Sequence, residues 1–163
     1  MLTAALIELL RRLAETAVEH GLFQLWDKWR ESEQHQSAGE RFIGSWIVLE
    51  LARLSYSRTT AKKPQPPNQR DQARMLTNSQ VVVLLSEMLK LRQGDHVLLK
   101  KSPQNFNALR SQLTKFHLEF SVKSGGQVAN FQQFSVMAAT IGAAVTKLVN
   151  KNLSAEVAEA DAK

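Results

Sequence analysis

The apolar residues of the first third of the chain recur at the spacing of an amphipathic helix. Between residues 2 and 20 they stand at positions 2, 6, 9, 10, 13 and 17, so they share one face. Gly21 predicts a break or kink, after which residues 22–33 resume the same period. The polar run 32–40 predicts a turn. A third helix follows over about residues 41–58, and its wide apolar surface predicts burial on more than one side.

The composition changes at residues 59–72, TTAKKPQPPNQRDQ. This stretch holds three of the four prolines of the chain and no large apolar residue. Consecutive prolines exclude a helix interior and favour an extended, solvated chain. We therefore expect an exposed loop or linker rich in Pro, Gln and Lys. It would divide an N-terminal helical part (1–58) from a basic helical part (73–150).

Helical periodicity returns over about residues 71–93. The run VVVLL within it would also suit a strand, but its length and the following SEMLKLRQ favour a helix. Gly94 stops the helix, and DHVLL (95–99) is either a strand or a connector that buries its leucines.

The next helix is predicted by its cap and by its spacing. Ser102 is a good N-cap and Pro103 suits the first helical position. Five apolar residues then step by three and four along one narrow face: Phe106, Leu109, Leu113, Phe116 and Phe120.

A last helix is expected over about 127–150, where Ala138, Ala139, Gly142 and Ala143 would permit close approach of a neighbouring helix. The alanine-rich and acidic residues 151–163 predict a frayed tail.

The predicted fold class is all-α. No period-2 pattern is long enough for a sheet. We expect a compact bundle of about five to six helices, built either around one core or as two helical lobes joined by the 59–72 loop. A chain of 163 residues is long enough for both arrangements.

Composition excludes several classes of site and suggests a compartment. The chain has no cysteine, which excludes disulfides and thiolate metal sites and fits a reducing, cytoplasmic setting. No run approaches the roughly 18–20 apolar residues that span a bilayer. In the N-terminal apolar run the charges follow the apolar residues and Glu8 interrupts them, so a secretion signal is not expected.

The net charge of +6 lies in the middle of the chain. Residues 61–123 hold 11 Lys and Arg against 4 Asp and Glu, whereas residues 1–60 hold 7 against 8 and residues 124–163 hold 3 against 3. A basic middle between two neutral ends indicates an acidic partner at one surface.

Catalytic patterns are missing. The chain has no Gly-rich phosphate loop and no serine in a nucleophile-elbow context, and its four histidines have no metal-ligand spacing. Asp95 and His96 are the one adjacent acid–imidazole pair, in an expected turn. We predict no enzyme, cofactor or metal site, although an enzyme built from common residues stays open.

Ten cations of the basic middle are candidate contacts to a phosphate backbone, because each neutralised phosphate releases counterions. The alternative for those in the loop is that Lys, Gln and Pro simply make up solvated loops. The ten are Lys62, Lys63, Arg70, Arg74, Lys90, Arg92, Lys100, Lys101, Arg110 and Lys123.

Lys100 and Lys101 stand just before a helix start, where free N–H groups already favour an anion. A bound phosphate would explain their placement; the alternative is two solvent-exposed lysines. The turn at Gly94 would bring them near Lys90 and Arg92. Most aromatic residues fall on core positions, which leaves Trp29 and Tyr56 as candidates for base stacking.

The sequence therefore predicts a non-catalytic helical subunit of a nucleoprotein assembly. Its partners would be RNA or DNA backbone and other protein subunits, or further copies of itself. In architecture such a small, basic, all-helical chain resembles the helical small subunits of CRISPR effector complexes, and viral or phage packaging proteins fit equally well. The alternatives are a helical adaptor whose basic loop meets an acidic protein, and membrane attachment through residues 2–18, whose glutamates an anionic bilayer would repel.

Overall fold

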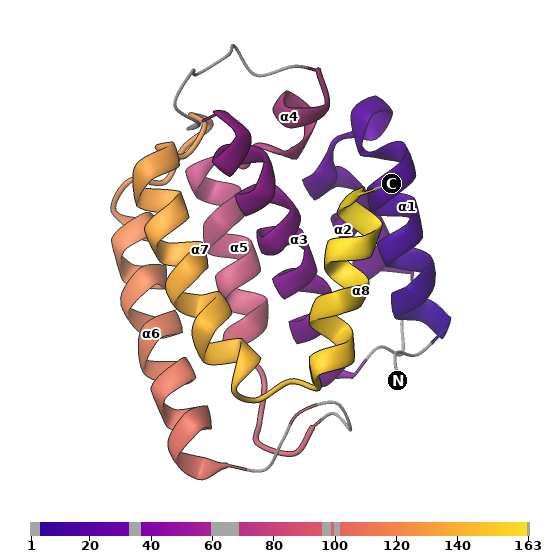
Figure 1. Cartoon of the computed structure of the whole chain (residues 1–163). Coiled ribbons are helices and arrows are strands. Elements are labelled where there is room, and N and C mark those ends of the chain that lie inside the picture. Colours follow the sequence, from indigo (N-terminus) through magenta and orange to yellow (C-terminus); the bar gives the residue numbers. More distant parts are fainter. Residues whose placement is uncertain (1–3, 33–36, 60–68, 96–98, 100–101, 163) are drawn as a thin grey trace.

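The computed structural model describes residues 4–32, 37–59, 69–95, 99 and 102–162 (Figure 1). Over these residues the all-α prediction is confirmed, but there are eight helices instead of the expected five to six. They are α1 (Ala4–His20), α2 (Leu22–Ser32), α3 (Ala38–Thr59), α4 (Gln69–Arg74), α5 (Asn78–Leu89), α6 (Pro103–Ser121), α7 (Phe131–Thr146) and α8 (Lys151–Ala162).

Helix α3 is the centre of the molecule. In Figure 1 it runs between α5 and α7 on one side and α1, α2 and α8 on the other, and it contacts all five. Its residues 42–49 are all buried, so the predicted burial on more than one side is confirmed. The buried apolar residues form one cluster with members from before and after residues 59–72. The two helical parts therefore share a core.

The helix expected over 71–93 is two helices. Thr77 ends the intervening segment with a capping box: its hydroxyl accepts the N–H of Gln80 at 3.1 Å, and the Gln80 side chain accepts the N–H of Thr77 at 3.0 Å. The segment between α4 and α5 hydrogen-bonds to the segment before α7, because the Leu76 carbonyl accepts the N–H of Ala129 at 2.8 Å. The helical prediction for VVVLL is confirmed within α5.

The C-terminal residues differ from the predicted frayed tail. They form α8, in which Leu153, Val157 and Ala160 are buried against the rest of the molecule. Their spacing of four and three residues places them on one helix face, and α8 packs on α1 and α3. The alanine and acidic residues around these three positions made the apolar spacing difficult to recognise in the sequence.

The two aromatic residues considered for base stacking are both in the core. Trp29 is 3% exposed and Tyr56 is 1% exposed. The Tyr56 hydroxyl donates a hydrogen bond to the Ala129 carbonyl at 3.0 Å, which ties α3 to the segment before α7. Neither ring is available to a nucleic acid base, so the stacking prediction is wrong for both.

Burial raises the pKa of Tyr56 to about 12, because the ionised phenolate would lose its hydration. The unfolded chain has a tyrosine pKa of about 10, so this group stabilises the fold fully below pH 10 and loses that contribution between pH 10 and 12. We expect a loss of about 2–3 kcal/mol across this window. Tyr56 is the single tyrosine of the chain, so its absorbance reports the titration directly.

The matched variant is Tyr56→Phe, which lacks the ionisable group. Its denaturant-unfolding free energy is expected to fall less steeply over the same pH window than that of the unaltered chain. Parallel pH profiles for the two proteins would contradict the assignment.

Candidate nucleic-acid interface

Arg110 of α6 is hydrogen-bonded to the turn that follows α5. Its Nη1 donates to the Leu91 carbonyl at 3.0 Å, and the residue is nevertheless exposed. One N–H of the guanidinium holds the turn, which leaves further donors of the planar group directed elsewhere. The sequence predicted that this turn lies near Lys100 and Lys101, which fall outside the described residues; its contact with Arg110 was not predicted.

The turn itself presents Arg92. The Asp95 carboxylate accepts the backbone N–H of Arg92 at 2.7 Å, and Gly94 adopts the left-handed conformation with φ of +87°. Asp95 therefore caps the turn, and the Arg92 side chain remains exposed. Gly94 was predicted to stop the helix, but α5 already ends at Leu89 with Lys90 as its C-cap, and Gly94 lies in the turn that follows.

A shallow depression of about 470 Å³ lies along the outer side of α6 next to this turn. Two of its side chains are cations, two are hydroxyls and one is an amide. They are Asn107, Arg110, Ser111, Thr114 and Lys115. Such a set combines charge with neutral hydrogen-bonding groups that suit phosphate and sugar oxygens.

These cations are not neutralised by the described part of the chain. Within it, no carboxylate oxygen lies within 4.0 Å of a side-chain nitrogen of Arg92, Arg110 or Lys115, in contrast to the ion pairs elsewhere. Lys90 differs, because its Nζ lies 3.1 Å from a carboxylate oxygen of the buried Glu87. Glu87 also faces Arg30 of α2 at 3.6 Å. Lys90 therefore contributes less free charge to this face.

Two of the ten candidate cations lie elsewhere. Arg74 is fully buried, so the prediction that it meets a phosphate is wrong; packing of α4 against α1 and α3 encloses it. Lys123 lies beyond the other end of α6 and donates to the Gln133 side chain at 3.1 Å. About thirteen residues of helix separate it from Arg110, roughly 20 Å at the rise of an α-helix.

The remaining candidates fall outside the described residues. They are Lys62, Lys63, Lys100 and Lys101, together with the side chain of Arg70, whose backbone belongs to α4. The cap beside the two central lysines is described: Ser102 accepts the N–H of Asn105 at 3.3 Å and Pro103 begins the helix, as expected.

Lys115 was missed as a candidate in the sequence. It points away from the apolar stripe of α6, and this orientation was visible in the helical period. A position opposite the core is where a side chain reaches a partner, so the same pattern could have selected Lys115, Ser111 and Thr114.

A second groove, of about 430 Å³, lies over α3 between α7 and α8. Its one charged pair is internally satisfied, because Arg53 donates two hydrogen bonds to Glu50, both at 3.0 Å. The hydrogen bonds with Glu50 raise the pKa of Arg53. The small residues Ala139, Gly142 and Ala143 line this groove, whereas close helix packing had been expected of them.

Other chemistry is sparse among the described residues. They contain no group of three His, Asp or Glu side chains placed to hold a metal ion. None of their helices combines the length and apolar character required to cross a membrane. His117 hydrogen-bonds Ser86 at 2.9 Å and so links α6 to α5.

No protein-family model matches the chain, and neither a curated protein nor a solved structure matches it.

Proposed function

We propose that the protein is a non-catalytic helical subunit that binds the phosphate backbone of RNA or DNA within a larger nucleoprotein assembly. The observation that supports this most is the contact between Arg110 and the Leu91 carbonyl. It places an exposed guanidinium of α6 beside the turn that carries Arg92. The polar side chains of Asn107 and Thr114 in the depression extend the same surface.

The chemistry of this surface favours backbone contact over base recognition. Guanidinium and ammonium groups neutralise phosphates, and hydroxyl and amide groups add hydrogen bonds to their oxygens. The three tryptophans and the tyrosine are buried, and the exposed Phe131 does not line the depression, so this surface offers none of these rings for stacking on bases. Affinity would therefore depend little on base sequence.

The test is the double substitution Arg92→Ala and Arg110→Ala, assayed by fluorescence anisotropy on a labelled oligonucleotide at low salt. We expect a loss of affinity of about tenfold or more, since two phosphate contacts are removed. Lys147→Ala is the matched control: Lys147 is exposed at the end of α7 and outside the surface, and its loss should change affinity little.

Arg110→Lys separates charge from the structural hydrogen bond. Lysine keeps the cation but lacks the planar guanidinium that reaches Leu91, so most of the affinity should remain. A folded double variant that binds as tightly as the unaltered chain would refute this surface.

A protein–protein adaptor is the second candidate function. It is favoured by large apolar side chains that are exposed on α6, at its C-cap and on α7, namely Leu118, Val122, Phe131 and Val136. Exposed apolar side chains that gather into a patch are typical of protein contacts. Co-purification of a stoichiometric protein partner after nuclease treatment, without any nucleic-acid affinity, would favour this function over the first.

A further inference from the structure

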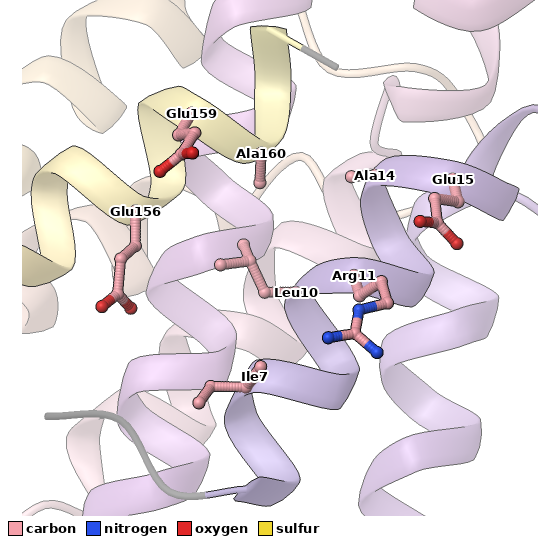
Figure 2. Close-up of a pocket in the computed structure, with 8 residues that line it drawn as sticks. All are labelled: Ile7, Leu10, Arg11, Ala14, Glu15, Glu156, Glu159 and Ala160. Carbon is pink, nitrogen blue, oxygen red and sulfur yellow. The ribbon is translucent and has the colours of Figure 1, made fainter.

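A groove of about 290 Å³ lies between α1 and α8. Figure 2 shows Leu10 of α1 directed into the space between the two helices and Ala160 facing it from α8. Ile7, which is 41% exposed, and Ala14 extend this apolar floor along α1. The groove therefore has room and an apolar lining for side chains from outside the molecule.

The rim of this groove is acidic. Glu15 comes from α1, and Glu156 and Glu159 come from α8. The single cation of the lining, Arg11, lies 3.9 Å from Glu8 on its own helix. One carboxylate oxygen of Glu156 is covered and accepts no hydrogen bond from the described residues. A partner that fits this groove would carry apolar side chains flanked by cations.

The outer face of α6 has this chemistry. Leu118 is 69% exposed and Val122 is 81% exposed, the two highest values among the exposed large apolar residues of the described chain. Together with Ser111 and Lys115 they step by four, three and four residues, so the four side chains share one face directly opposite the core. A lysine thus stands one turn from an apolar pair.

The two surfaces lie on opposite sides of the molecule. Figure 1 places α6 at one edge and α1 and α8 at the other, and both surfaces can be occupied at once. We propose that the chain associates with itself head to tail: Leu118 and Val122 of one copy fill the α1–α8 groove of the next, and Lys115 meets its acidic rim. This inference goes beyond the proposed function and does not depend on it.

The symmetry of the contact follows from this placement. A copy that docks through α6 keeps its own groove open, so the interface is heterologous and joins further copies into a ring or an open chain. Apolar burial would supply the affinity and the opposite charges would set the orientation. A subunit that repeats along a nucleic-acid backbone would be assembled in this way.

The experiment measures molar mass by light scattering across a concentration series, after nuclease treatment so that a shared nucleic acid cannot link the copies. The molar mass of the unaltered chain should rise beyond that of a dimer as the protein concentration increases. Leu118→Glu with Val122→Glu should stay monomeric, and so should Glu15→Lys with Glu159→Lys. Lys147→Glu is the charge-reversal control, and its molar mass should rise with concentration as that of the unaltered chain does.

Mixing the two monomeric double variants distinguishes this proposal from other modes of association. The Leu118→Glu, Val122→Glu variant keeps an intact groove, and the Glu15→Lys, Glu159→Lys variant keeps an intact α6 face. Together they should form a 1:1 complex whose molar mass does not rise further with concentration. Helicity by circular dichroism checks that each is folded. An unaltered chain that is monomeric throughout, growth that stops at the dimer, or two variants that do not combine would overturn the proposal.

Discussion

Replacement of Phe120 by alanine is expected to lower the free energy of unfolding by about 3–5 kcal/mol. Phe120 is fully buried in the core, at the end of the apolar stripe of α6. Its removal subtracts the transfer free energy of the ring and leaves a cavity, because surrounding helices relax only partly. Denaturant unfolding followed by circular dichroism measures the change.

Leu118→Ala is the matched control within the same helix, measured at a protein concentration low enough that copies do not associate through Leu118. Leu118 lies two residues away but faces solvent, so its truncation should change the free energy of unfolding by no more than about 0.5 kcal/mol. Similar losses for both variants would contradict the described orientation of α6.

Substitution of Gly44 by leucine is expected to destabilise the fold by about 1–3 kcal/mol or more. A Cβ at this position would lie 3.0 Å from Cζ3 of Trp29 and 3.2 Å from Cδ2 of Leu9. Both neighbours are buried, so the larger side chain would force α1 and α2 away from α3. Thermal and denaturant unfolding of the variant test this expectation.

Gly142→Ala is the comparison at a second helical glycine. A Cβ there would meet a carboxylate oxygen of Glu50 at 3.2 Å, the end of a side chain that is able to move. The gain of helix propensity, about 1 kcal/mol for alanine over glycine, should then dominate. A stable Gly44→Leu protein or a strongly destabilised Gly142→Ala protein would contradict the packing around α3.

The features that were predictable from the sequence are local ones. The apolar steps of three and four residues placed five residues on the core face of α6. Leu109, Leu113, Phe116 and Phe120 are buried, and Phe106 is partly buried against the core. Ser102 likewise caps that helix as expected. A helical period and a cap depend only on residues within a turn or two, so a single sequence is enough to reveal them.

The features that were missed are set by contacts between distant segments. Arg74 was taken for a surface cation because it closely follows the polar residues 59–72, but α1 and α3 enclose it. The break between α4 and α5 depends partly on Ala129, whose N–H bonds the Leu76 carbonyl. Helix α8 is ordered by the surfaces of α1 and α3, which its own composition does not reveal.

The same distinction between local features and contacts of distant segments applies to the candidate site. The turn at Gly94 was predicted to bring Lys90 and Arg92 near Lys100 and Lys101, which fall outside the described residues, and the contact from Arg110 to Leu91 was not predicted. The pairing of Lys90 with Glu87, three residues earlier in the chain, and the distance of Lys123 from Arg110 along α6 are local features that the helical period could have revealed. The contact of Glu87 with Arg30 of α2 depends on how distant segments pack, so the sequence did not reveal it.

The salt dependence of nucleic-acid affinity tests the central claim most directly. With Arg92 and Arg110 each neutralising a phosphate, the logarithm of the association constant should fall linearly with the logarithm of salt concentration. The expected slope is about −1.5 to −2, for strands of different base sequence alike. Affinity that is absent at low salt, or that is unaffected by salt, would contradict the claim.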